Sequence, residues 1–425
     1  MTIVRHCGSI LGVAEATSAG TTKHLTVIRQ RVEISEQGTE IGAWLVKALT
    51  LPEFEAAEIV AREVEAGSCS SDIVDIEPFR ATIRPGEQAD QVELVLSNSQ
   101  GSHPSDGHEA ARWFLGTLTS SWLDAGRGQP HLHAAALTDK SDRAVLLLGE
   151  SGAGKSTMTA HLAASGLDLL SDEQVVLFTK QGLIGAFTRP LLIKSSAVPF
   201  LPFLPSAESS SSDPDPSHSR LLSAKEAGSR HRLTARPALV ALLVRDDLAE
   251  EVLWEVVSPA EAIEAFCANN LDLARHPLAG MEAFAQVAAT VPVIRLYYRD
   301  AVDAAPILRE LLEHPPGALD VAWDVAQSDS YGPALDPQAS SIGGPARIHP
   351  AEGVVTAVVG DLVVAFEPHS RHVVRLNPAG AILWLSLPWP EMPTDEDFNG
   401  AVDFVTGLFD RGFLTGPGVA SDQHP

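Results

Sequence analysis

The sequence predicts an α/β protein, with a mixed α+β region before the α/β core and a small winged-helix-like α+β domain after it. From Leu132 to Leu177 the pattern runs strand, strand, Gly-rich turn, helix, strand and strand. Residues 315–347 are rich in Pro, Gly and Ser and show little periodicity, which is typical of a linker. Three short strand patterns and a helix pattern then follow. The predicted parts are 1–128, 129–314, the linker 315–347, 348–416 and a tail at 417–425.

Length and composition agree with several globular domains. The chain has 425 residues, which at roughly 150 residues per domain predicts two to three domains. Hydrophobic residues make up 45% and charged residues 20%, so a wholly disordered protein is excluded. The 30 basic and 55 acidic residues give a net charge of −25. This charge disfavours binding to nucleic acid or to an anionic membrane surface, because like charges repel.

The cysteine count and the hydropathy pattern predict a cytoplasmic protein. Three cysteines without CxxC spacing suggest neither a disulfide framework nor a thiolate metal site. No apolar run reaches the roughly 18 residues that a membrane span needs. Arg is far commoner than Lys in this Ala-rich chain, which hints at a bacterium with a GC-rich genome.

No motif in the region 1–128 indicates a catalytic or binding function. Its pattern predicts helices at 54–65 and 108–124 and strands at 73–83 and 91–97. What this region binds stays open.

The core continues beyond a long polar segment. Residues 202–218 are dense in Ser, Pro and Asp, and the basic residues follow directly after them. Beyond this segment the sequence predicts a buried strand at 238–244, helices at 259–269 and 281–288, and a strand at 291–297. The basic residues of the segment are Arg220, Lys225, Arg230, Arg232 and Arg236.

A Gly-rich turn carries the most specific motif of the chain. The segment fits the pattern GxxxxGK[ST], and a chance match in this length is on the order of one in a hundred. Its residues are Gly149, Glu150, Ser151, Gly152, Ala153, Gly154, Lys155 and Ser156, followed by Thr157.

The surroundings of this motif favour a phosphate-binding loop. An apolar strand at 144–148 precedes it, and a helix pattern at 156–165 follows it and ends before Gly166. Backbone N–H groups and a helix N-terminus then face one anion. Lys155 would reach the β- and γ-phosphates of ATP, and the Ser156 hydroxyl would be a ligand of Mg²⁺. The alternative is an ordinary Gly-rich turn between strand and helix.

Two acidic residues end the next strand pattern. Asp172 and Glu173 follow the apolar run 167–170, so they lie at the carboxyl edge of a strand, where open α/β sheets bind ligands. One carboxylate can join the Mg²⁺ shell while the other accepts a proton from an acceptor hydroxyl. The alternative is two solvated acids in a turn.

The span from His133 to Leu177 resembles the bacterial HPr serine kinase/phosphorylase family, particularly its shorter relatives in peptide-modification gene clusters. That family has a His about fifteen residues before the loop, as His133 is here, and an acidic pair seventeen and eighteen residues after the loop lysine, as Asp172 and Glu173 are. The resemblance implies Asp172 as general base on the acceptor hydroxyl and His133 as an active-site partner. From its place beside the loop, Asp172 is also expected to be a Mg²⁺ ligand together with Ser156. A structural role for His133, or for His131 on the same strand, stays open.

The resemblance covers roughly residues 129–315 and is strongest in the first third of this range. Several residues differ from the family pattern. Glu173 replaces the usual second Asp, and Thr157 stands where the bifunctional members carry Glu. A downstream phosphorolysis signature is absent from the sequence. We therefore expect a kinase without phosphorylase activity. Because the family is oligomeric, a homo-oligomer is a candidate assembly.

Basic residues after the acidic pair are candidates for clamping phosphates or for receiving an acidic peptide, because guanidinium groups suit both. Arg189, which precedes Pro190, is the strongest, and Lys194 and the basic half of the 203–236 segment are others. For each one, a solvated surface charge is the alternative.

Residues 348–416 resemble the PqqD-like precursor-peptide recognition domains. The resemblance rests on strands at 354–359, 362–367 and 372–376, the run 376–384 with Asn377 as helix N-cap, a second helix, and 412–414. An extended leader peptide of a precursor can add itself to the edge of such a sheet. Pro388 and Pro390 depart from the family pattern. Trp384, Ile382 and Phe413 are either core residues or peptide contacts.

The leading hypothesis is an ATP-dependent kinase that phosphorylates a Ser or Thr hydroxyl of a ribosomally made peptide held by the C-terminal domain. One alternative is a nucleotide-gated peptide-binding protein that transfers no phosphoryl group. Another is a small-molecule kinase that uses the PqqD-like domain only for docking.

Overall fold

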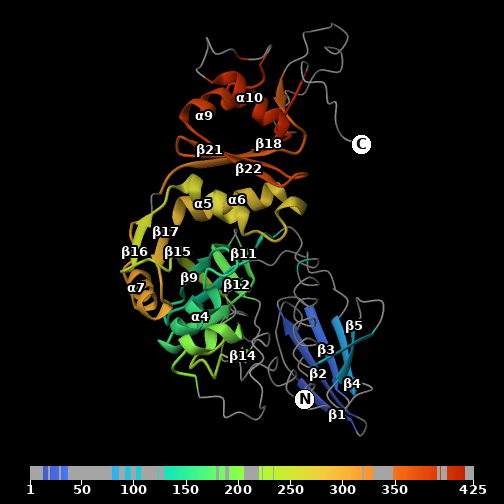
Figure 1. The fold of residues 1–425 in the computed structure, drawn as a ribbon. Helices are drawn as coiled ribbons and strands as arrows, with labels where there is room; N and C mark the ends of the chain where they lie inside the picture. The colour runs from blue at the N-terminus through green and yellow to red at the C-terminus, as the bar shows by residue number, and fades with distance from the viewer. Residues whose placement is uncertain are drawn as a thin grey trace. The chain divides into compact units, whose positions relative to one another are not determined.

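The computed structural model describes most of the chain after residue 128. Described are residues 123, 129–178, 181–186, 191–204, 220–222, 224–232, 234–317, 320–328, 348–389, 393 and 400–416, and before them the backbone of six strands. Helices, strands and mixed sheets make up this part, which is an α/β architecture (Figure 1). None of its helices is both long enough and apolar enough to span a bilayer.

The six N-terminal strands form one sheet with strand order β1-β2-β3-β4-β5-β6. β3 and β4 are parallel and the other neighbours are antiparallel. The predicted strand at 91–97 is confirmed as β5, and the predicted strand at 73–83 overlaps β4. The predicted helices at 54–65 and 108–124 lie outside the described residues, Leu123 excepted. The bounds are β1 (Val13–Thr17), β2 (Gly20–Val27), β3 (Gln30–Glu36), β4 (Phe79–Pro85), β5 (Gln91–Leu96) and β6 (Ser102–Asp106).

A nine-stranded, mostly antiparallel sheet forms the centre of the chain. Seven of its strands follow the order β10-β8-β9-β15-β12-β11-β7. In addition, β17 pairs with β15, and β16 pairs with β17. β9 and β15 are a parallel pair. β10 and β9 both run antiparallel to β8, so they point the same way and their carboxyl ends lie at one edge. The bounds are β7 (His131–Leu132), β8 (Ala135–Thr138), β9 (Arg143–Leu148), β10 (Asp168–Ser171), β11 (Val175–Phe178), β12 (Leu183–Ala186), β15 (Thr234–Arg245), β16 (Leu253–Val256) and β17 (Val293–Tyr298).

Helices α4 (Lys155–Ala164) and α7 (Ala301–Glu313) pack on each other, α4 against β8 and α7 against β9 and β15. α4 ends as predicted, because Gly166 adopts φ 100° and its N–H donates to Ala163 O at 3.0 Å. The sequence did not predict α7. A small pair of strands, β13 (Leu191–Ile193) and β14 (Arg220–Leu222), borders this part of the chain.

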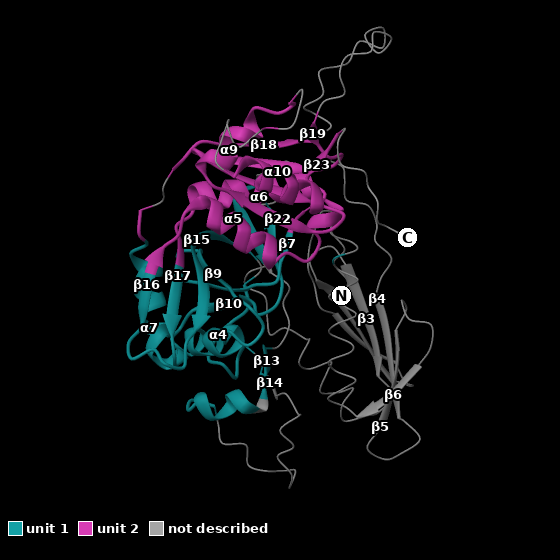
Figure 2. Cartoon of the chain, turned by 45° about the horizontal axis from the view of Figure 1, so that its top comes forward, with its two compact units in different colours: residues 1–127, 131–254, 295–315 teal, residues 128–130, 255–294, 316–425 magenta. Residues whose placement is uncertain are grey.

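Contacts divide the chain into two compact units (Figure 2). The first contains residues 1–127, 131–254 and 295–315, and the second contains 128–130, 255–294 and 316–425. The second unit therefore joins α5 (Pro259–Ala268) and α6 (Pro277–Thr290), which are in the predicted 129–314 part, to the strands of the predicted 348–416 part.

The second unit is built on a four-stranded antiparallel sheet with the order β18-β20-β21-β22. α5 and α6 pack on this sheet, and α9 and α10 lie on its other side (Figure 1). β18 lies inside the predicted linker 315–347. The bounds are β18 (Trp323–Gln327), β20 (Val355–Val359), β21 (Leu362–Glu367), β22 (His372–Leu376), α9 (Pro378–Leu385) and α10 (Ala401–Asp410), with a short pair β19 (His349–Pro350) and β23 (Leu414–Thr415) beside them.

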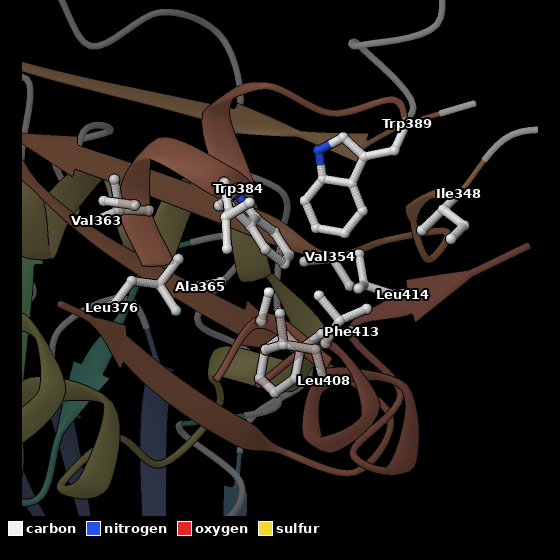
Figure 3. Packing of buried hydrophobic residues seen from close by; sticks show 14 residues of the cluster. Ile348, Val354, Val363, Ala365, Leu376, Trp384, Trp389, Leu408, Phe413 and Leu414 are labelled. Carbon is white, nitrogen blue, oxygen red and sulfur yellow. The ribbon is translucent and has the colours of Figure 1, made fainter. Parts of the chain in front are cut away.

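Two tryptophans and a phenylalanine anchor the core between this sheet and the C-terminal helices (Figure 3). The rings of Trp384 and Phe413 meet edge to face, with centroids 6.4 Å apart. The buried Trp384 Nε1 donates to Thr356 Oγ1 at 3.1 Å, which satisfies its polar atom. Trp384 and Phe413 are therefore core residues, whereas Ile382 on α9 is 60% exposed.

Candidate functional site

The Gly-rich loop lies where β9 ends, at the carboxyl edge of the sheet. Its conformation depends on glycine at two positions. A Cβ at Gly149 would lie 2.9 Å from the backbone oxygen of Leu243 in β15, and Gly154 adopts φ 89°. Gly154 is also the N-cap of α4, and it has no side chain to cap the helix. The first N–H groups of α4 are thus available to an anion.

Lys155 begins α4 and is 8% exposed. Its Nζ donates to the backbone oxygen of Gly149 at 2.6 Å and to that of Glu150 at 3.4 Å, so the ammonium bridges the start of the loop. Burial lowers the pKa of Lys155, the Glu173 carboxylate opposes this shift, and the nearby ammonium of Lys194 adds to it. The structure therefore places Glu173 and Lys194 close to the loop lysine.

The turn after β10 fixes the acidic pair. The hydroxyl of Ser171 accepts the backbone N–H of Glu173 at 3.4 Å and that of Gln174 at 3.1 Å. Asp172 is 2% exposed, and its Oδ2 accepts the backbone N–H of Leu192 in β13 at 3.1 Å. The two acids thus have different surroundings, because Asp172 is buried beside β13 while Glu173 remains accessible.

Glu173 reaches His133 across the sheet. Their Oε1 and Nε2 atoms are 3.5 Å apart, and the side chains are 41% and 36% exposed. β7 pairs with β11, which brings the residue after β7 beside the turn that carries Glu173. His131 is opposite Val176 in this pairing and is 1% exposed. The structure therefore brings His133, rather than His131, to the accessible side of the acidic pair.

Two basic residues of the long segment, Arg230 and Arg232, lie away from the loop. Arg230 and Arg232 pair with Asp168 at 3.3 Å and 3.8 Å, and Arg232 also pairs with Asp142. Asp168 begins β10, so these pairs are at the end of the sheet opposite the loop. As candidates for a phosphate clamp, Arg230 and Arg232 are thus wrong, because both guanidinium groups neutralise carboxylates at that opposite end. Arg189 lies outside the described residues.

The site residues fit a nucleotide with Mg²⁺. The loop offers backbone N–H groups and an ammonium for phosphates, and the side chains of Ser156 and Asp172 carry oxygen atoms of the kind that Mg²⁺ prefers. Among the described residues, no three His, Cys, Asp or Glu side chains gather as a metal site. Mg²⁺ does not need such a cluster, because it commonly takes one or two protein oxygens together with phosphates and water.

Comparison with known proteins finds similar chains among solved structures, one of which is a kinase/phosphatase. No protein-family model and no curated protein matches this chain. The HPr(Ser) kinase/phosphatase from Coxiella burnetii shares 14% identity over 43% of this chain and 93% of its own length. The TM-score of 0.24 is too low to establish a common fold.

Sequence reasoning missed one residue beside the loop. Tyr298, the last residue of β17, donates from its hydroxyl to the backbone oxygen of Ala153 at 2.5 Å. The two residues are 145 positions apart. A tyrosine at the end of an apolar strand gives no local signal, so only the tertiary fold reveals this contact.

The second candidate surface is the edge of the C-terminal sheet. β18 pairs with β20, which leaves β22 as the other outer strand among the described residues. Arg375 in β22 pairs with Glu261 at 3.0 Å and Glu264 at 3.5 Å, both in α5. Outer strands offer backbone N–H and C=O groups to a further strand.

Proposed function

We propose that this protein is an ATP-dependent phosphotransferase that phosphorylates a Ser or Thr hydroxyl of a precursor peptide. One observation carries the proposal: the Gly-rich loop lysine, Lys155, has an accessible carboxylate, Glu173, beside it, and that carboxylate contacts His133. A cation for phosphate and groups for proton transfer thus meet at one edge of the sheet.

The proposed reaction is a direct transfer. The acceptor hydroxyl oxygen forms a bond to the γ-phosphorus of ATP, and the bond from that phosphorus to the oxygen bridging to the β-phosphate breaks, with its electron pair going to ADP. The hydroxyl proton passes to the pair formed by Glu173 and His133. Lys155 and the loop N–H groups stabilise the negative charge on the phosphoryl oxygens. Mg²⁺, held by Ser156 with Asp172 as a further ligand, would neutralise phosphate charge.

Geometry distinguishes the two acids of the pair. The resemblance implies Asp172 as the base. Glu173, however, is the more accessible of the two acids, and its negative charge acts on the Lys155 ammonium. We therefore assign proton acceptance to Glu173 and His133. Asp172 holds β13 beside the site through the Leu192 N–H.

The peptide substrate is proposed from the C-terminal part of the chain. Support comes from the PqqD-like pattern of 348–416 and from β22, an outer strand to which an extended leader peptide can add. A bound leader would raise the concentration of its acceptor residue near the loop without new contacts at the reacting atoms. The expected compartment is the cytoplasm, where ATP and newly made peptides are present.

The test uses synthetic peptides encoded next to this gene. Each is incubated with full-length protein, ATP and Mg²⁺, and intact-mass spectrometry measures the gain of one phosphoryl group. We expect Lys155→Ala to lower the rate by about 10²- to 10³-fold or more. The matched control is Lys140→Ala, because Lys140 is exposed in the turn before β9, away from the loop.

Three outcomes separate the alternatives. Phosphorylated peptide with wild-type protein and with Lys140→Ala, but not with Lys155→Ala, supports the proposal. Peptide binding that depends on ATP without any mass gain supports the nucleotide-gated binding protein instead. ATP consumption that needs a small molecule, with unchanged peptides, supports the small-molecule kinase.

A further inference from the structure

Tyr298 contacts the Gly-rich loop from the end of β17. Its side chain is 1% exposed, and its hydroxyl donates to Ala153 O at 2.5 Å. A Cβ on Gly154 would lie 2.6 Å from the same hydroxyl oxygen, so only glycine fits there. The backbone of Tyr298 is fixed as well, because its C=O accepts the N–H of Asp246 at 2.9 Å.

This contact determines the orientation of one peptide group in the loop. A trans peptide is planar, so the carbonyl of Ala153 and the N–H of Gly154 point in opposite directions. The Tyr298 hydroxyl holds the carbonyl on the β17 side. The Gly154 N–H must then point away from the Tyr298 hydroxyl, and N–H groups of such Gly-rich loops are the groups that hold phosphates.

We propose that Tyr298 is a positioning residue of the phosphate loop, which aims the Gly154 N–H at the β-phosphate of a bound nucleotide. The inference rests on the proposed nucleotide binding. Tyr298 touches no reacting atom, and it acts only through the peptide between Ala153 and Gly154. Without its hydroxyl this peptide can rotate, because glycine at 154 places little restriction on the backbone.

The hydroxyl remains a donor at every pH at which the protein would work. Burial raises the pKa of Tyr298 to about 12, although the nearby Arg245 guanidinium opposes the shift. A protonated phenol donates to a carbonyl, whereas a phenolate cannot. The contact should therefore not depend on pH between 6 and 9, values that are roughly three or more units below that pKa.

The test compares two adjacent tyrosines in the full-length protein. Tyr298→Phe removes only the hydroxyl, and Tyr297→Phe is the control, because successive residues of a strand point to opposite faces. Isothermal titration calorimetry measures binding of MgADP and of pyrophosphate at a temperature well below the melting temperature of each variant. We expect Tyr298→Phe to bind both ligands about tenfold more weakly, and Tyr297→Phe to bind as wild type does.

The outcomes separate this inference from the proposed function. If wild-type protein binds no MgADP, the proposed function fails. If wild-type protein binds and folded Tyr298→Phe binds equally well, the inference about Tyr298 is overturned even if the melting temperature falls, since a purely structural role would lower stability alone.

A second measurement tests the proposal without Tyr298→Phe, in case that variant fails to fold. The chain has three tyrosines, so 3-fluorotyrosine labelling gives a simple ¹⁹F spectrum that Tyr297→Phe and Tyr331→Phe assign. The Tyr298 resonance should shift when MgADP or pyrophosphate is added. An unchanged Tyr298 resonance at saturating ligand contradicts the proposal.

Discussion

At the scale of single residues, the strand pattern predicted the acidic pair and the family resemblance implied His133, but the sequence did not predict the different roles of the two acids. The turn at Ser171 buries Asp172 and leaves Glu173 accessible, a difference that depends on β13 and therefore on contacts distant in sequence. Tyr298 was not predictable for the same reason. The sequence could indicate which residue types gather near the loop, because strand ends share one edge of a sheet, but not which side chains point into the site.

The division within the acidic pair leads to a test at this scale. Glu173→Gln should lower kcat by about 10²-fold or more while MgADP affinity is retained, because a general base is lost and the loop is untouched. Asp172→Asn should lower kcat less but weaken MgADP binding, since an Asn oxygen can still accept the Leu192 N–H but binds Mg²⁺ more weakly than a carboxylate does. Steady-state kinetics with a confirmed acceptor, together with calorimetry, measures both quantities. The reverse order of effects would make Asp172 the base, as the family resemblance implies.

At the scale of elements, local patterns predicted the helices and strands with clear boundaries. β21 and β22 match their predicted ranges, and the Asn377 N-cap is confirmed by its bond from the Gly380 N–H at 2.8 Å. β18 was missed because it is a short strand in a segment rich in loop-forming residues, and pairing with β20 determines its conformation. Tertiary pairing overrides weak local preference in such segments.

A buried carboxylate at the end of β21, Glu367, accepts hydrogen bonds from the turn that leads to β22. Glu367 accepts hydrogen bonds from the backbone N–H and the hydroxyl of Ser370, both at 2.5 Å, and from the backbone N–H of His369 at 3.0 Å. Burial alone would raise the pKa of Glu367, but the bonds from Ser370 and His369 lower it to about 2. The ionised form is therefore bound better by the folded turn than by the unfolded chain.

This pKa shift predicts the pH dependence of stability. A lowered folded-state pKa contributes stability above the ordinary value of 4.5, and this contribution is lost as the pH falls towards 2. Glu367→Gln should lower the stability of the second unit by roughly 1–3 kcal/mol at pH 7, and by less near pH 3. Differential scanning calorimetry at both pH values measures this effect. Exposed Glu352→Gln in the same unit is the control, and an equal loss at the two pH values would contradict the assignment.

At the scale of the whole molecule, the second unit combines parts that the sequence separates. α5 and α6 lie between two strands of the central sheet in the chain, yet they pack on the four-stranded sheet of the C-terminal part. Buried residues of α5 and α6, among them Phe266 and Phe284 with ring centroids 5.6 Å apart, form part of this unit. Amphipathic patterns predicted both helices but could not predict which sheet they cover, because that choice depends on contacts distant in sequence.

The central claim is that the Gly-rich loop binds the phosphates of a nucleotide, and calorimetric titration of the full-length protein with MgADP tests it most directly. We expect wild-type protein and Lys140→Ala to bind one MgADP with equal affinity, and Lys155→Ala to bind at least about tenfold more weakly, because a charged donor to the phosphates is lost. Equal binding by Lys155→Ala and wild type, or no binding by folded wild-type protein, would contradict the account.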